Sequence, residues 1–61
     1  MTIRKGMTII HSVSGLLVIV GNGQHRGHRY YLVQRADGWR VRISRSKMLS
    51  DIETGQAFIY S

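Results

Sequence analysis

The sequence predicts an all-β protein, specifically a small five-stranded SH3-like barrel with one short helical turn before the last strand. Three observations favour this fold class: the chain is rich in Ile, Val and Tyr, it contains no proline, and apolar and polar residues alternate over its first three quarters. β-branched and aromatic side chains suit the pleated surface of a strand. Closing the sheet would remove exposed edges at which so apolar a chain aggregates. An OB-like barrel or an open meander is the alternative arrangement.

The first two expected strands are Met7–Val13 and Leu16–Val20, with a turn at Ser14-Gly15. The first strand alternates between apolar and polar residues over most of its length. The second is a continuous apolar run, which is typical of a strand buried on both faces or of one whose outer face meets a partner. We therefore place the centre of the core in Leu16–Val20.

The segment Gly21–His28 has three glycines and no large apolar residue, so we expect an exposed, mobile loop there. Beyond it, Arg29–Arg35 and Trp39–Ser44 have the composition of two further strands. The Asp37-Gly38 pair between them is typical of a two-residue type I′ turn. These two strands are expected to form a tight hairpin.

A helical pattern replaces the alternation after Ser46, which is a candidate N-cap. Met48, Leu49 and Ile52 recur at helical spacing, and Gly55 is suited to stop a helix at its C-terminus. The spacing predicts a short helix or a 3₁₀ turn.

A later helix start is the alternative, because Ser50 and Glu53 match a capping box. The segment Gln56–Tyr60 then forms the last strand. We expect residues 1–61 to make a single domain, since 43% apolar residues in a chain of this length support one small core.

The charge of the chain restricts its partners. Nine Lys and Arg against three Asp and Glu give a net charge of +6, and seven of the nine basic residues are Arg. Small basic domains bind nucleic acid, anionic membranes or acidic proteins, and Arg favours planar, bidentate contacts with phosphate or carboxylate. All three acids lie after residue 36, so the first half of the chain has no internal counter-ion.

The expected two-residue turn sorts the hairpin side chains onto two faces. The core face would carry Leu32, Trp39, Val41 and Ile43. The other face would carry Arg29, Tyr31, Val33, Arg35, Arg40 and Arg42. Arg35 would then lie opposite Arg40 with no acid beside them, an arrangement that is unfavourable for folding and that an external anion would relieve.

A three-residue loop through Ala36 is the alternative, and it would pair Arg40 with Gln34 instead. Arg40 and Arg42 would still share the face opposite Trp39. A solvated face with no ligand explains the same pattern, because salt screens exposed charges.

Basic residues interleaved with aromatic rings are typical of strand surfaces that bind nucleic acid, where guanidinium groups neutralise phosphates and a ring stacks on a base. Tyr31 is the expected stacking platform, with Tyr30 next if the register shifts; core or interface packing is the alternative for both. The Gly/His/Arg loop would supply a second, flexible arm. The candidate nucleic-acid-binding residues are therefore Arg26, Arg29, Tyr31, Arg35, Arg40, Arg42, His25 and His28.

We expect no metal, no cofactor and no catalysis. His25 and His28 have the spacing of metal ligands, but zinc needs three or four ligands and the chain has no cysteine. No paired carboxylates or nucleophile-elbow motif appears. An enzyme whose site is assembled by oligomerisation is the remaining alternative.

No membrane association is expected either. Arg4-Lys5 followed by Met7–Val20 superficially resembles a signal peptide, but His11 and Ser12 interrupt the apolar run. The run is also too short to span a bilayer as a helix, which takes about 20 residues. A cytoplasmic location is the simpler expectation and agrees with the absence of cysteine.

These patterns predict a small, basic, non-catalytic nucleic-acid-binding protein that contacts phosphates through an Arg-rich strand face and the Gly/His/Arg loop. The alternative is a protein-interaction module, such as an adaptor, inhibitor or transcription regulator of a mobile genetic element, that docks on an acidic partner. We also expect a homo-oligomer, because Leu16–Val20 and Phe58-Ile59-Tyr60 offer more apolar surface than a small barrel buries.

Overall fold

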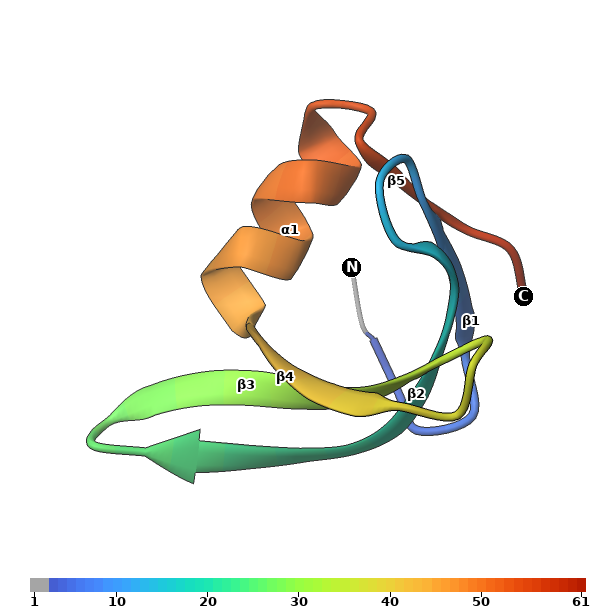
Figure 1. Ribbon diagram of the computed structural model, residues 1–61. Coiled ribbons are helices and arrows are strands. Elements are labelled where there is room, and N and C mark those ends of the chain that lie inside the picture. The colour runs from blue at the N-terminus through green and yellow to red at the C-terminus, as the bar shows by residue number, and fades with distance from the viewer. Residues whose placement is uncertain (1–2) are drawn as a thin grey trace.

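The strands form one five-stranded antiparallel sheet, which a single helix covers on one side (Figure 1). The computed structural model describes residues 3–61. Its elements are, in chain order, β1 (Thr8–His11), β2 (Gly15–His25), β3 (His28–Arg35), β4 (Arg40–Ser44), α1 (Arg45–Glu53) and β5 (Ala57–Ile59). The mostly β class is confirmed, and every expected strand overlaps an observed one.

The sheet has the strand order β4-β3-β2-β1-β5 and does not close on itself. Strands β1 to β4 form a meander, and β5 returns to pair with β1. Figure 1 shows the sheet bending sharply, with α1 on its concave side. Because α1 packs against β3, β4 and β5, the helix occupies the space between the two edge strands. The SH3-like barrel is therefore not confirmed; the sheet is an open, curved meander.

The segment Gly21–His28 is a hairpin and not the expected loop. Strand β2 continues to His25, which pairs with His28 at the start of β3. Between them lies a two-residue turn, Arg26-Gly27, in which both residues have positive φ (51° and 80°). Such a turn matches the twist of the flanking strands. The glycines of this segment suggested a loop, but Gly21 and Gly23 lie within the strand.

A β-bulge interrupts the pairing of β2 with β3. Ile19 pairs with Val33 and Gly21 pairs with Leu32, so Val20 is an extra residue on β2. A bulge of this kind bends its strand and increases the local twist. Beyond it, the alternation of β2 has shifted by one residue.

The β3–β4 hairpin has the three-residue loop and not the two-residue turn. The Arg35 N–H donates to Trp39 O at 2.8 Å, and the Gly38 N–H donates to Arg35 O at 2.9 Å. Gly38 has φ 88°, the left-handed position that closes such a loop. Gln34 consequently pairs with Arg40, the register of the alternative prediction.

This register reverses the expected faces of β3. Val33 is fully buried and Tyr31 is only 8% exposed, although both were expected on the arginine-bearing face. Leu32 and Trp39 were expected in the core, but Leu32 lies on the outer face and Trp39 is 67% exposed beside the loop. A shift of one residue moves a whole strand's side chains to the opposite face.

The core lies between the concave face of the sheet and α1. Its buried apolar residues are Ile3, Ile9, Leu17, Ile19, Tyr31, Val33, Met48 and Ala57. Leu17 and Ile19 confirm that the apolar run of β2 is central. This apolar run is buried on one face only, because the side chains that alternate with Leu17 and Ile19 point away from α1.

The helix begins earlier and is longer than expected. Ser44, not Ser46, is the N-cap, and its Oγ accepts the Lys47 N–H at 3.1 Å. The Ser50/Glu53 capping box is wrong, since Glu53 ends the helix. Gly55 follows with φ 81°, as expected of a C-terminal stop.

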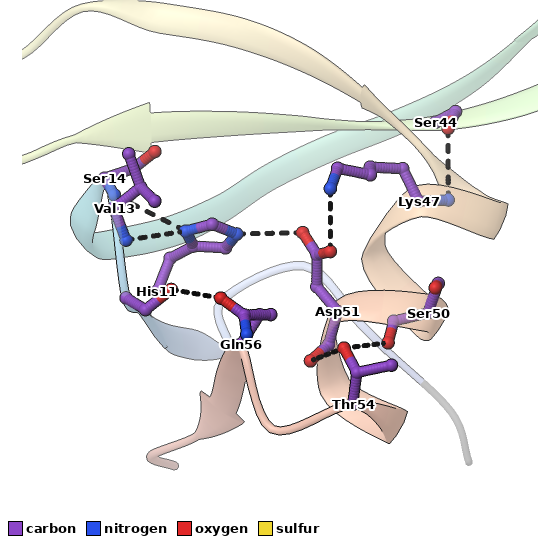
Figure 2. Close-up of polar contacts among 10 residues, drawn as sticks. His11, Val13, Ser14, Ser44, Lys47, Ser50, Asp51, Thr54 and Gln56 are labelled. Carbon is purple, nitrogen blue, oxygen red and sulfur yellow. Dashed lines mark hydrogen bonds and ion pairs between the residues drawn. The ribbon is translucent and has the colours of Figure 1, made fainter.

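A buried carboxylate joins α1 to the β1–β2 turn (Figure 2). Asp51 is 5% exposed and accepts from Lys47 Nζ and from His11 Nε2, each at 2.8 Å. His11 Nδ1 in turn accepts the backbone N–H of Val13 at 3.1 Å and that of Ser14 at 3.4 Å. Because Nδ1 accepts hydrogen bonds, the imidazole proton is on Nε2, and the Nε2–H group donates a hydrogen bond to Asp51. Through these hydrogen bonds, Asp51 links α1 to the β1–β2 turn.

These contacts lower the pKa of Asp51 below its ordinary value of 3.8, first through the Lys47 hydrogen bond and then through that of His11. Asp51 therefore has a lower pKa in the folded chain than in the unfolded chain. At a pH between these two pKa values, the unfolded chain binds more protons than the folded one. Stability from this group is fully present above about 3.8 and is lost as pH falls through the folded-state pKa.

We expect Asp51→Asn to lower the free energy of unfolding at neutral pH and to remove much of its decline in acid. Denaturant unfolding followed by circular dichroism from pH 7 down to pH 2 measures both. Glu53→Gln is the matched control, because Glu53 is exposed and accepts no side-chain hydrogen bond within residues 3–61. Equal pH profiles for the two variants would contradict the role given to Asp51.

Candidate nucleic-acid interface

Two arginines project from β4 on the side of the sheet that faces away from α1. Val41 and Ile43 pack toward the core, so Arg40 and Arg42 point outward and are exposed. We call their surroundings the arginine face, which consists of Tyr30, Leu32, Gln34, Arg40 and Arg42. The three-residue loop sets this composition, because it places the even-numbered residues of β3 beside the even-numbered residues of β4.

Arg42 is held against an aromatic ring. Its Cζ lies 4.8 Å from the centroid of Tyr30, a cation–π contact worth about 0.5–1 kcal/mol at an exposed site. The ring itself lies over Gly23 of the neighbouring strand: a Cβ there would be 2.6 Å from Tyr30 Cζ. Glycine at this position therefore makes room for the ring, and the ring supports the guanidinium.

Arg40 is held by an amide. Its Nε donates to Gln34 Oε1 at 3.1 Å, across the paired strands. A neutral amide orients the guanidinium but leaves its charge uncompensated. Within residues 3–61, the remaining N–H donors of Arg40 have no side-chain acceptor and can meet an external one.

Two of the three acids of the chain are engaged elsewhere. Asp51 is buried in the network with Lys47, and Asp37 Oδ2 lies 3.5 Å from Arg35 Nη2 at the loop. Within residues 3–61, Arg40 and Arg42 have no carboxylate within 4.0 Å. The arginine face thus carries positive charge without an internal counter-ion.

The structure separates Arg35 and Tyr31 from the arginine face. Arg35 pairs in register with Leu17, a core residue, and its charge is partly compensated by Asp37. Tyr31 is buried on the core side. Tyr30 therefore occupies the place expected for Tyr31, as the alternative register implies.

The remaining candidates lie at the far end of the β2–β3 hairpin and are exposed there. His25 and His28 pair across the strands, and Arg26 lies in the turn between them. Arg29 pairs with Gln24, on the same side of the hairpin as Tyr31 and opposite to Tyr30. The arm is thus an ordered hairpin, and Arg29 does not join Arg40 and Arg42.

Sequence reasoning missed the position of Gly23. The spacing of Gly23 among other glycines predicted a loop. The neighbouring residues in the sequence do not indicate that Gly23 lies beneath a tyrosine ring. The pairing of Gly23 with Tyr30 depends on the bulge at Val20, which only the three-dimensional structure reveals.

An apolar row crosses the same side of the sheet at its other end. Ile10 of β1 pairs with Phe58 of β5 and with Leu16 of β2, and all three point away from the core. Their exposed fractions are 38%, 60% and 46%. We call this set the apolar row.

Residues 3–61 bring together no three His, Cys, Asp or Glu side chains that could hold a metal ion. None of their helices is long and apolar enough to cross a membrane. No protein-family model, curated protein or solved structure matches this chain.

We expect Gly23→Ala to displace the Tyr30 ring and release Arg42 while leaving the fold intact, because the obstructed atoms are at the mobile end of the side chain. NMR spectra should show altered Tyr30 ring and Arg42 Nε signals. Gly21→Ala is the matched control, since a Cβ there meets Leu32 at an ordinary 3.8 Å. Identical perturbation of the Tyr30 ring in both variants would refute the packing role of Gly23.

Proposed function

We propose that this protein binds nucleic acid through phosphate contacts of the arginine face, with low sequence specificity and without catalysis. The observation that carries the proposal is the presence of Arg40 and Arg42 side by side on an outward face with no carboxylate within 4.0 Å in residues 3–61. Two like charges close together on one face repel each other at a small cost in stability. A polyanion removes that cost by supplying the missing counter-charge.

The geometry suits a phosphate backbone. Arg40 and Arg42 are two residues apart on one strand, so their Cα atoms are separated by about 6.6 Å. This distance is close to the spacing of successive phosphates along one nucleic-acid strand. Guanidinium groups bind phosphate through paired N–H donors, and both groups are oriented before any ligand arrives, Arg40 by Gln34 and Arg42 by Tyr30.

Tyr30 acts in this proposal as the support of Arg42. The guanidinium lies over the ring, so a base would stack on the guanidinium plane, a contact that RNA-binding proteins use for unpaired bases. The exposed hairpin end with His25, Arg26 and His28 extends the positive surface. Contacts of these kinds carry little sequence information.

Salt dependence tests the proposal. If three or four phosphates are neutralised, the logarithm of the binding constant should fall with the logarithm of salt concentration with a slope of about −3 on duplex DNA. The double variant Arg40→Gln/Arg42→Gln should make this slope shallower by about 2 and weaken binding to all sequences alike. Fluorescence anisotropy with a labelled oligonucleotide measures both quantities.

The double variant Arg4→Gln/Lys5→Gln is the matched control. It removes the same charge from the segment before β1, where neither side chain forms an ion pair within residues 3–61. Its slope should stay near that of the wild type. A slope near zero for the wild type, or an equal loss in both double variants, would sink the proposal.

The second candidate function is a protein-interaction module, and the apolar row is the observation that favours it. A row of three exposed apolar side chains is unusual for an isolated sheet face and suits a protein contact. An acidic partner would complement the arginines of the same sheet. This function predicts that heparin displaces the acidic partner and that no oligonucleotide binds. The first function predicts oligonucleotide binding.

We further propose that the apolar row pairs with itself in a second copy of the chain, because a two-fold interface buries the same patch on both subunits. Leu16→Gln should shift sedimentation equilibrium toward the monomer. Val13→Gln is the control, since Val13 is 86% exposed in the β1–β2 turn and lies outside the row. A monomeric wild-type protein at high micromolar concentration would contradict self-association.

A further inference from the structure

A second positively charged surface lies across the β2–β3 hairpin from the arginine face, in a cleft of about 500 Å³ that none of the preceding arguments uses. The cleft is bordered by the β2–β3 hairpin and by the first residue of α1. Its functional groups come from Asn22, Gln24, Arg29, Tyr30, Tyr31 and Arg45. In Figure 1 the β2–β3 hairpin extends well past the start of α1.

Two guanidinium groups border this cleft from separate elements. Arg29 lies near the start of β3 and Arg45 is the first residue of α1. Both are exposed, and neither has a carboxylate within 4.0 Å in residues 3–61. Among the residues that the structure describes, no acid lines the cleft. Two uncompensated cations around one hollow favour an anionic group between them.

The cleft also presents neutral polar groups. Asn22 pairs in register with Tyr31, and Gln24 pairs with Arg29, so the two amides and Arg29 share one side of the hairpin. Neither amide is held by a side-chain hydrogen bond within residues 3–61. An amide both donates and accepts, which suits the edge of a nucleobase. Tyr30 and Tyr31 add aromatic surface.

We propose that this cleft binds a single nucleotide unit, with the phosphate between Arg29 and Arg45 and the base against the amides of Asn22 and Gln24. The volume lies within the range of about 300–1,000 Å³ that small-molecule sites have. Tyr30 borders both surfaces, because it carries Arg42 and also lines the cleft. The choice of ligand class rests on the proposed function, whereas the residues that would hold the phosphate and the base are separate from Arg40 and Arg42.

An NMR titration of ¹⁵N-labelled protein with adenosine monophosphate, inorganic phosphate and a short single-stranded oligonucleotide tests this site. The mononucleotide should shift the amide signals of Asn22, Gln24, Arg29 and Arg45. Arg29→Gln/Arg45→Gln should weaken its binding at least tenfold, whereas Arg35→Gln, at the other end of β3, should not. Asn22→Ala/Gln24→Ala should weaken mononucleotide binding but leave phosphate binding unchanged. All substituted side chains are exposed, and a dispersed spectrum shows that each variant folds.

Three results would overturn the assignment to a nucleotide. The mononucleotide could leave the cleft signals unshifted, or inorganic phosphate could bind there as tightly as the mononucleotide, which would indicate an anion site only. Oligonucleotide shifts confined to Arg40 and Arg42 would retain the proposed function and reject the cleft. Conversely, mononucleotide binding in the cleft with no oligonucleotide binding would support the cleft and reject the arginine face as a nucleic-acid surface.

Discussion

The three-residue loop between β3 and β4 is the constraint on which the surface of this protein depends. Gly38, in the left-handed region with φ 88°, closes that loop and sets the pairing of Gln34 with Arg40. With one residue fewer, every side chain of β3 would face the other way relative to β4. The buried position of Val33 and the contact between Arg42 and Tyr30 both follow from this single register.

The bulge at Val20 has the corresponding effect on the other side of β3. It moves Gly23 beneath Tyr30 and places Asn22 beside Tyr31. If the pairing ran on without a bulge, Val20 would pair with Leu32, and Asn22 rather than Gly23 would lie opposite Tyr30. The loop therefore sets which arginines point outward, and the bulge provides the aromatic support and the neighbouring cleft. Two local irregularities in the backbone account for both candidate surfaces.

The distribution of the few acids connects stability with the proposed function. Asp51 is used inside, where Lys47 and His11 satisfy it and where it joins α1 to the β1–β2 turn. Asp37 is used at the loop, next to Arg35. Because these carboxylates have structural roles, none of them compensates Arg40 or Arg42. Two of the three carboxylates therefore contribute to the fold, and Arg40 and Arg42 remain exposed on the outer surface.

The sequence by itself determined the mostly β class, the central place of Leu16–Val20 and a helix built around Met48, because alternation, apolar runs and helical spacing are local properties. Its net charge of +6 is also the basis for proposing an anionic ligand. Only the tertiary structure decided that Gly21–His28 is a hairpin, that the sheet stays open, and that Tyr30 rather than Tyr31 lies beside the arginines. Those outcomes depend on which residues pair across strands, and a one-residue change in pairing leaves the local pattern unaltered while it exchanges the two faces of the sheet.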